Sequence, residues 1–341
     1  MGNVRVVLYG VGAIGRLVAK TLYEKRKGVE IVGAIDIDVR KVGRDLGEIA
    51  GLGRCIGVKV SSDPDKVLEE AKPDVVILMT SSFLRKVYPQ IITCLEHGSN
   101  VISTCEELSY PYIVDEELSR KIDEEARRRG LRVLGAGINP GFLMDLLPIV
   151  LTTPCLYVDK ISVKRVIDAS KRREPFQRKI GAGLAPEEFK RKIESGEITG
   201  HMGLPQSIAL IAKALDWKLD EIKVKEPEPI IADKTVKTQF LEVEAGMVAG
   251  LEQAASGIIS GEEKITLLFR ASVSEQHGFD SIDIIGDPPI HFKTSPEVHG
   301  DTGTVGTIVN LIPGLLKAPP GLLTVVDLLL TKFHGTLDST K

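Results

Sequence analysis

The chain has 341 residues and a mass of 37.1 kDa, which exceeds the size at which a single hydrophobic core stops growing, so we expect two domains. Its net charge of −3 gives no positive field that would attract nucleic acid or an anionic membrane surface. Hydrophobic residues make up 43%, yet no run of about 18 uncharged apolar residues occurs, so neither a disordered chain nor a membrane span is expected.

The first third of the chain alternates short β-branched segments with amphipathic ones. We expect strands at 4–9, 30–35, 75–79, 101–104 and 132–134, and helices at 14–25, 84–97 and 115–129. Strand–helix–strand order at this spacing requires parallel strands joined by helical crossovers. The pattern therefore predicts an α/β fold that begins with a doubly wound parallel sheet.

The pattern changes after Asn139-Pro140-Gly141, where longer alternating segments begin. We expect strands at 160–168, 237–249, 265–274 and 281–285, and helices at 186–194, 204–215 and 302–311, with Pro-rich turns after the last helix. Alternation of apolar and charged residues suits a mostly antiparallel sheet with one solvated face.

These elements divide the chain into three parts. We assign residues 1–138 to the parallel-sheet domain, 139–300 to an α+β second domain, and 301–341 to a C-terminal helical segment that returns to the first domain.

A glycine-rich turn lies between the first expected strand and the first helix. In Gly10-Val-Gly12-Ala-Ile-Gly15, Gly10 permits the tight turn, Gly12 lets the backbone approach a pyrophosphate, and Gly15 allows close helix–strand packing. Asp36 ends the second strand, 21 residues after Gly15, where a carboxylate accepts hydrogen bonds from an adenosine ribose. The sequence thus predicts a Rossmann domain that binds NAD, with Ala13 and Ile14 also at the cofactor.

The choice between NAD and NADP depends on the residues around Asp36. A carboxylate at this position repels a 2′-phosphate and favours NAD. Arg40, Lys41 and Arg44 follow closely and could neutralise such a phosphate. We therefore expect both NAD and NADP as cofactors.

Hydroxyl side chains follow the strand at 75–79. Thr80, Ser81 and Ser82 could line the nicotinamide half of the cofactor, because ligands bind at the carboxyl ends of parallel strands. The same residues could cap the helix that follows, and the two roles are compatible. Cys105 ends the next strand at the same edge and is placed with the cofactor-binding residues.

Two adjacent carboxylates, Glu106 and Glu107, also follow that strand. Two neighbouring negative charges cost folding free energy unless water solvates them, cations pair with them, or a function requires them. Successive residues point apart, so we expect at most one to face the cofactor while the other caps or pairs locally. A carboxylate beside a nicotinamide can take a proton from an ammonium group or activate water against an iminium. The alternative is that both cap the helical region near residue 115.

Substrate-binding candidates come from the segments that follow. Asn139 could cap a helix or present its amide to the nicotinamide carboxamide. Arg165 could bind a substrate carboxylate through its guanidinium fork, and Asp168 could hold an ammonium group if its strand twists or bulges. A solvated strand with surface ion pairs is the alternative. His201 lies in a loop before a helix, where loops commonly line clefts.

Several classes of site are not supported. The histidines lack metal-ligand spacing with carboxylates, so no metal is expected, and no GxSxG elbow of a serine hydrolase occurs. The four cysteines form no CxxC pair and fit reduced thiols in a cytoplasm. The small number of Asn and Gln beside many charged residues is typical of thermophile proteins.

Longer segments carry a family resemblance that spans nearly the whole chain. They are STCEELSYP, GAGINPGFLMDLLP, DASKRREPFQRKIGAG, GHMGLPQS and HGDTGTVGTIVNLIPGLLKAPPGLLTVVDL. The chain resembles the 2,4-diaminopentanoate dehydrogenase family, in the dihydrodipicolinate-reductase-like group that also includes native amine dehydrogenases. The His-His…Lys segment and the Ser-Gly-Thr loop of dihydrodipicolinate reductase itself are missing.

The resemblance implies reversible NAD(P)-dependent oxidative deamination at C4 of a 2,4-diamino acid, giving 2-amino-4-oxopentanoate and ammonia, a step in amino-acid degradation. It also implies a homodimer built on the sheet of the second domain. Related amine dehydrogenases place a catalytic glutamate at this strand end, which maps to Glu106, with Glu107 as the reserve. Asn139, Phe142, Arg165 and His277 map more loosely to the substrate pocket.

Two other functions remain open from the sequence. An alcohol-oxidising enzyme similar to homoserine dehydrogenase would need a lysine base where Glu106 stands. A non-catalytic NAD(H) sensor would leave the basic segment around Arg165 without a purpose, and no DNA-reading motif supports it.

Overall fold

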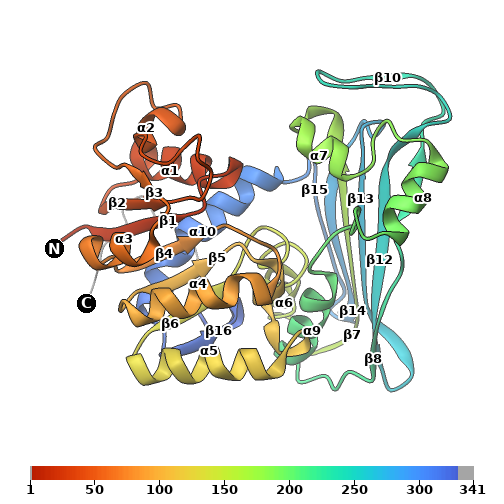
Figure 1. Cartoon of the computed structure of the whole chain (residues 1–341). Helices are drawn as coiled ribbons and strands as arrows, with labels where there is room; N and C mark the ends of the chain where they lie inside the picture. The colour runs from red at the N-terminus through yellow and green to blue at the C-terminus, as the bar shows by residue number, and fades with distance from the viewer. Residues whose placement is uncertain (1, 329–341) are drawn as a thin grey trace. The chain divides into compact units, whose positions relative to one another are not determined.

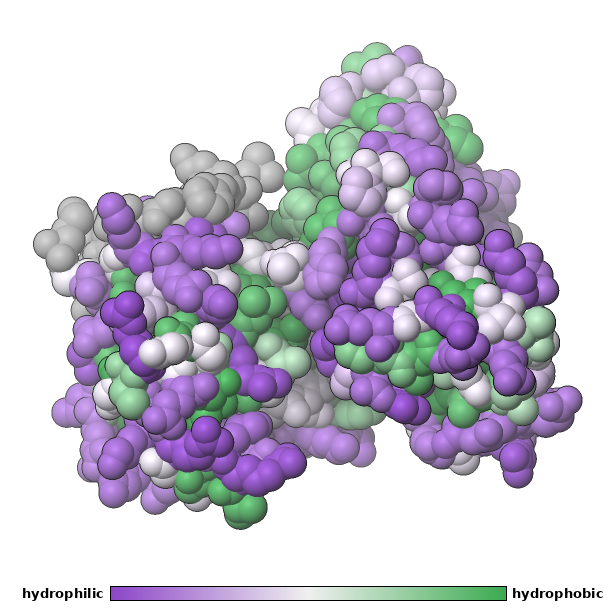
Figure 2. Space-filling view, turned by 90° about the horizontal axis from the view of Figure 1, so that it is seen from above, coloured by the Kyte–Doolittle hydropathy of each residue, from purple (hydrophilic) through white to green (hydrophobic). Residues whose placement is uncertain are grey.

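The computed structural model describes residues 2–328 and divides into two compact units (Figure 1). Of the described residues, 2–142 and 300–328 form the first unit and 143–299 form the second. Residues 329–341, part of the expected C-terminal segment, lie outside the described residues. On the face of the molecule shown in Figure 2, hydrophilic residues surround smaller hydrophobic patches on both units.

The first unit is a seven-stranded sheet with the strand order β16-β6-β5-β4-β1-β2-β3. All of its strand pairs are parallel. The strands are β1 (Val4–Tyr9), β2 (Val29–Ile35), β3 (Val60–Ser61), β4 (Val75–Leu78), β5 (Asn100–Ser103), β6 (Arg132–Gly135) and β16 (Gly321–Leu323). The central strands β4 and β5 are buried along their whole length, as expected for a sheet covered on both faces.

Helices pack against this sheet in two groups. One group packs through contacts between α3 and α4 and between α4 and α5, and the other through contacts between α1 and α10. The helices are α1 (Ala13–Lys25), α2 (Leu46–Ile49), α3 (Pro64–Ala71), α4 (Leu84–Glu96), α5 (Glu116–Arg129) and α10 (Gly300–Lys317), with the 3₁₀ turns η1 (Glu106–Ser109), η2 (Pro111–Ile113) and η4 (Val325–Asp327). Asp115 caps α5 through its side chain and Gly130 ends the helix in the left-handed region, so local chemistry sets both ends.

The second unit contains a mixed sheet with the order β15-β14-β7-β13-β12-β8, and β9 also pairs with β12. Only the β7–β13 pair is parallel among its described strand pairs. The strands are β7 (Tyr157–Asp168), β8 (Glu221–Val224), β9 (Glu228–Ile231), β12 (Val248–Ile259), β13 (Glu262–Ser272), β14 (Phe279–Asp287) and β15 (Ile290–Thr294). Around the sheet lie α6 (Leu146–Leu151), η3 (Ala169–Lys171), α7 (Glu174–Lys179), α8 (Pro186–Glu194) and α9 (Leu204–Ala214).

The two faces of this sheet differ. Helix α9 packs on β12 and β13, with Ile208 against Gly257. Residues on the opposite face are only partly buried or exposed, as the alternation along the strands requires: Ser162, Lys164, Ala254, Ser256, Thr266 and Leu268. The predicted α/β fold, with a parallel Rossmann sheet and a mostly antiparallel second sheet, is confirmed.

Two element predictions are wrong. The expected strand at 237–249 is instead a short hairpin of β10 (Val236–Lys237) and β11 (Glu242–Val243), followed by β12. The Thr238 hydroxyl accepts hydrogen bonds from the N–H groups of Phe240 and Leu241 and so stabilises the turn. The last helix does not end at residue 311. It continues through Pro313 to Lys317, because its buried face continues and α10 packs on α1.

Candidate active site

The glycine turn has the shape that a dinucleotide requires. Gly10 has φ of +97°, and a Cβ there would lie 2.6 Å from the Met79 carbonyl oxygen. A Cβ on Gly15 would lie 2.1 Å from the Gly10 carbonyl oxygen, so both glycines are fixed by the protein's own packing. A Cβ on Gly12 would meet no atom within 4 Å, which leaves open space for a ligand to approach the backbone.

The start of α1 is suited to an anion. Gly12 is the N-cap, no side chain caps the helix, and no acidic residue lies in its first turn. Gly12 is exposed, and the next residues, Ala13 and Ile14, are partly exposed. The N–H groups and positive dipole end of the helix can therefore interact with a pyrophosphate.

Asp36 lies directly after β2, beside the glycine turn. Its Oδ2 accepts hydrogen bonds from the Val11 N–H and the Lys41 ammonium, each at 2.8 Å, and its Oδ1 accepts one from the Asp38 N–H at 2.9 Å. Burial raises the pKa of this carboxyl, but the hydrogen bonds from Lys41, Asp38 and Val11 outweigh it, and the pKa is lowered. Asp36 is thus anionic and is held against the turn, as a ribose-binding carboxylate must be.

The residues after β4 lie close to the glycine turn. The ideal Cβ of Gly10 would be 3.2 Å from Thr80 Cγ2, and the Thr80 hydroxyl donates to Gln90. Ser81 Oγ accepts a hydrogen bond from the Phe83 N–H at 3.2 Å. The N-cap residue of α4, Phe83, supplies no side-chain cap of its own. The expected capping of α4 by the hydroxyl residues is therefore limited to the Ser81 contact just before the helix.

Glu107 caps α4 from the next strand end. Its Oε2 accepts a 2.6 Å hydrogen bond from the Leu84 N–H, and its own N–H donates to the Ser82 carbonyl oxygen. The backbone carbonyl oxygen of Glu106 accepts a hydrogen bond from Ser109 Oγ at 2.7 Å. Within residues 2–328 its carboxylate has no hydrogen-bond or ion-pair partner. The Glu107 carboxylate is thus occupied as a helix cap, whereas the Glu106 carboxylate is available to bind or to exchange a proton with a ligand.

Cys105 differs from its expected role. Its side chain is 1% exposed and belongs to the hydrophobic core, and burial raises the pKa of the thiol to about 12. Only its backbone can contribute to a cofactor site. Asn139 and Phe142 follow β6 at the end of the first unit's N-terminal segment, and both are partly exposed.

Arg165 and Asp168 lie at the end of β7 in the second unit and have partners there. Arg165 is 2% exposed, donates to Asp280 Oδ1 and to the Val298 carbonyl oxygen at 2.7 Å each, and so fixes the segment near Val298. Asp168 accepts hydrogen bonds from the Ser170 N–H and hydroxyl and pairs with Lys171 at 2.9 Å. Both side chains therefore have partners within the second unit, and their expected contacts with substrate remain predictions.

The two candidate histidines have different surroundings. The His201 ring stacks on Phe269 with 4.2 Å between ring centroids. Desolvation, with smaller contributions from the charges of Lys179 and Arg165, lowers the pKa of His201 to about 3, so it is neutral at physiological pH. His277 lies in the exposed turn between β13 and β14.

Asp280 was not predicted from the sequence. Its Oδ2 accepts a hydrogen bond from the Val298 N–H at 2.8 Å, and its Oδ1 binds Arg165. Burial raises the pKa of this carboxyl although Arg165 opposes the shift. The sequence does contain a clue to its role. Asp280 alternates with Ile282 and Ile284 and so lies on the same buried face of β14, where a charged side chain requires a partner of opposite charge.

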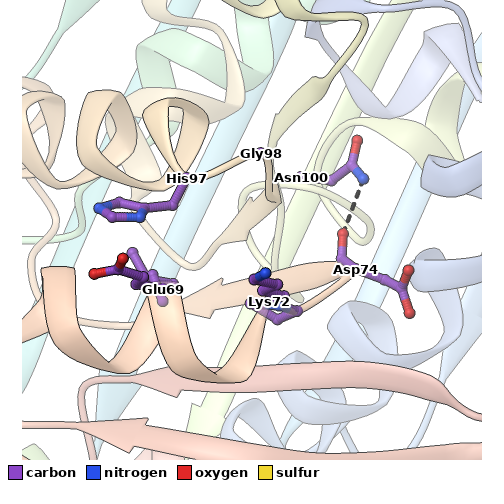
Figure 3. Close-up of a pocket in the computed structure, with 8 residues that line it drawn as sticks. Glu69, Lys72, Asp74, His97, Gly98 and Asn100 are labelled. Carbon is purple, nitrogen blue, oxygen red and sulfur yellow. Dashed lines mark hydrogen bonds between the residues drawn. The ribbon is translucent and has the colours of Figure 1, made fainter.

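A surface cavity of about 360 Å³ lies at the other edge of the first unit's sheet (Figure 3). Asp74 and Asn100 stand at the amino ends of β4 and β5, and the Asn100 amide donates to the Asp74 carbonyl oxygen. Glu69 and His97 face each other across it in Figure 3. Parallel sheets bind ligands at the carboxyl ends of their strands, so this cavity is not part of the candidate site.

Two further observations concern the described residues only. No helix between residues 2 and 328 is long and apolar enough to cross a membrane. The same residues contain no group of three or more His, Cys, Asp or Glu side chains arranged to hold a metal ion.

The first unit places the glycine turn, Asp36, Thr80 and the Glu106–Glu107 pair at one edge of a parallel sheet. A family model described as an oxidoreductase family with an NAD-binding Rossmann fold matches residues 4–134. Fold and site thus define a dinucleotide-dependent dehydrogenase, which confirms the predicted enzyme class.

The second unit identifies the family. A model of the 2,4-diaminopentanoate dehydrogenase C-terminal domain matches residues 142–337. The chain is 37% identical over 334 residues to the 2,4-diaminopentanoate dehydrogenase of Acetoanaerobium sticklandii, covering 96% of this chain and 94% of that protein. The chain therefore belongs to the 2,4-diaminopentanoate dehydrogenase family, as its motifs predicted.

Two amine dehydrogenases are also similar over the full length. One from Streptomyces virginiae is 25% identical over 358 residues, covering 98% of both chains. The solved structure of amine dehydrogenase from Mycobacterium smegmatis matches with a TM-score of 0.86 and 26% identity, covering 98% of this chain and 99% of that one.

Proposed function

We propose that the protein catalyses reversible oxidative deamination of a 2,4-diamino acid, converting 2,4-diaminopentanoate into 2-amino-4-oxopentanoate and ammonia. Membership of the family and the likeness to amine dehydrogenases support this reaction type. The main structural support for this reaction is the difference between two neighbouring glutamates. Glu107 caps α4, while the Glu106 carboxylate has no partner in the described chain.

Glu106 acts as the general base of the reaction. NAD(P)⁺ supplies the hydride acceptor for the carbon that bears the reacting amine. The Glu106 carboxylate takes a proton from the C4 ammonium, so that the neutral amine can release hydride from C4 and become an iminium. After that proton has passed to solvent, the Glu106 carboxylate takes a proton from water as the water adds to the iminium carbon. It returns this proton to the amine nitrogen of the carbinolamine, so that ammonia leaves and the ketone remains. General base help of this kind contributes about 10²–10⁴-fold to the rate.

The reaction is tested in the direction of amination. Purified protein with NADH, ammonia and 2-amino-4-oxopentanoate should consume NADH, measured as loss of absorbance at 340 nm. An alcohol-oxidising enzyme similar to homoserine dehydrogenase would oxidise homoserine with no need for ammonia. A non-catalytic sensor would bind NADH without turnover. NADH consumption that does not depend on ammonia would refute oxidative deamination.

The role of Glu106 is tested against its neighbour. Glu106→Gln should lower kcat at least about 100-fold and leave the Kd for NADH within about threefold. Glu107→Gln is the matched control, because glutamine keeps an oxygen that can accept from the Leu84 N–H. If Glu107→Gln shows the large loss and Glu106→Gln does not, the assignment is reversed.

We propose that residues of the first unit bind the cofactor. Gly10, Gly12 and Gly15 shape the pyrophosphate turn, with Ala13 and Ile14 at the start of α1. Asp36 binds the adenosine ribose, and Thr80, Ser81, Ser82 and Asn139 serve the nicotinamide half. We propose that NADP is accepted together with NAD, since cationic residues follow Asp36.

We propose Phe142 in the first unit, and His201 and His277 in the second, as substrate-binding residues, and Asn139 as a residue of both the cofactor and the substrate. Arg165 and Asp168 are positioning residues in this scheme, because each is occupied by contacts within the second unit. His201 is neutral and stacked on Phe269, and so offers a flat, uncharged wall.

We propose a homodimer that forms on the face of the second sheet opposite α9. Small and polar side chains there, including Ser162, Ala254 and Thr266, surround a shallow cavity of about 400 Å³. Light scattering after size exclusion should give twice the chain mass for the wild type and the chain mass for Ala254→Arg. Lys237→Glu, on the β10–β11 hairpin, is a control that should remain dimeric. A monomeric wild type would refute the proposal.

The cellular setting is also a proposal. The four cysteines are unpaired thiols, which suits the reducing cytoplasm and a role in amino-acid degradation there. The charged composition supports a thermophile source, which a thermal unfolding midpoint below about 65 °C, the upper end of the mesophile range, would contradict.

A further inference from the structure

Three cationic side chains follow Asp36, and the structure separates their roles. Arg40 is 85% exposed and forms a two-pronged pair with Asp38, at 2.9 and 2.8 Å. Arg44 lies 3.9 Å from Glu48. Lys41 alone among the three contacts Asp36, with its ammonium 2.8 Å from Oδ2, and it is only 23% exposed.

Of these three cations, only Lys41 is therefore close enough to neutralise the negative charge of Asp36 directly. The Lys41 ammonium lies 3.7 Å from Asp38 Oδ2 as well, but Asp38 is already paired with Arg40. Because Lys41 is largely shielded from water, its charge is screened less than that of an exposed lysine. An unpaired Asp36 would repel a 2′-phosphate strongly, whereas a paired one repels it weakly.

We propose that Lys41 is the residue that determines how well this site accepts NADP relative to NAD, because it offsets the charge of Asp36. The inference rests on the proposed cofactor site and deepens it. NAD carries a neutral 2′-hydroxyl, which can donate a hydrogen bond to the Asp36 carboxylate whether or not Lys41 is present. NADP carries a 2′-phosphate, whose negative charge meets Asp36 directly. Lys41 therefore matters for NADP far more than for NAD.

The test measures binding, without turnover. Isothermal titration of Lys41→Met with NADP⁺ and with NAD⁺ should show the Kd for NADP⁺ raised at least about tenfold and the Kd for NAD⁺ changed by less than about threefold. Arg44→Met is the matched control, since Arg44 makes no contact with Asp36, and its NADP⁺/NAD⁺ ratio should equal that of the wild type. If the ratio of the Kd for NADP⁺ to the Kd for NAD⁺ in Lys41→Met lies within threefold of the wild-type ratio, the proposal is overturned.

A second background tests the mechanism. In Asp36→Asn the negative charge is gone, while the asparagine oxygen can still accept from the Val11 N–H. Adding Lys41→Met to Asp36→Asn should change the NADP⁺/NAD⁺ ratio by less than threefold. If the full tenfold loss persists there, Lys41 does not act by offsetting Asp36 and the proposal is wrong. No substrate amine enters these titrations, so their result does not depend on whether oxidative deamination is the reaction.

Discussion

The carboxylate of Glu107 accepts a 2.6 Å hydrogen bond from the N–H of Leu84, 23 residues earlier in the chain. This contact joins the turn after β5 to the first turn of α4. It satisfies one of the N–H groups that every helix start leaves without an intrahelical partner. A negative charge there also interacts favourably with the helix dipole.

Removal of this cap should destabilise the first unit. Glu107→Ala should lower the free energy of unfolding by about 0.5–2 kcal/mol, the usual cost of losing a capping side chain. Glu107→Gln keeps an acceptor oxygen and should lose less than half as much. Urea unfolding followed by circular dichroism measures both, and an unchanged stability of Glu107→Ala would contradict the capping role.

The glycines of the turn should separate folding from binding. Gly15→Ala places a methyl group 2.1 Å from the Gly10 carbonyl oxygen and should reduce stability by about 1–3 kcal/mol. Gly12→Ala meets no protein atom, so its thermal midpoint should stay near the wild-type value while the Kd for NAD⁺ rises at least tenfold. Normal NAD⁺ binding by Gly12→Ala would show that the pyrophosphate does not approach this backbone.

Thiol reactivity should follow burial. Burial raises the pKa of both Cys94 and Cys105 to about 12, so neither forms a thiolate at pH 8. Cys55 is exposed. Iodoacetamide at pH 8, followed by peptide mass spectrometry, should label Cys55 and leave Cys94 and Cys105 unmodified until denaturant is added. Rapid labelling of Cys105 in the folded protein would show that its turn opens readily.

His201 should make stability depend on pH. Its folded pKa of about 3 lies below the unfolded value of 6.5, so between these values the unfolded chain binds a proton that the folded chain does not. Above pH 6.5 the titration of His201 costs the folded state no stability. As the pH falls from 6.5 toward 3, protonation of His201 in the unfolded chain lowers the free energy of unfolding. The slope is at most about 1.4 kcal/mol per pH unit.

The matched variant is His201→Gln, which cannot take up that proton. Its free energy of unfolding should fall less steeply than that of the wild type between pH 6.5 and pH 4.5, measured by urea titration at each pH. Only the slopes are compared, because the substitution also removes the stacking on Phe269. Parallel curves would show that His201 is protonated equally in both states.

Local patterns in the sequence determined many helices and strands in both units. The apolar run at 4–9 became β1, and the amphipathic segment at 186–194, with proline at its start, became α8 with the predicted bounds. The spacing of Gly10, Gly12, Gly15 and Asp36 predicted the tight turn between β1 and α1 and the carboxylate beside it. Such features depend on residues within one turn or one strand, so neighbouring positions suffice to reveal them.

Other features depended on residues far apart in the chain. Adjacent Glu106 and Glu107 look equivalent in sequence, and the Leu84 N–H distinguishes them. From its own segment Arg165 is a candidate for binding a substrate carboxylate, yet Asp280, 115 residues later, pairs with it in the interior. A side chain's role follows from whether its charge finds a buried partner, and only the tertiary structure brings those partners together.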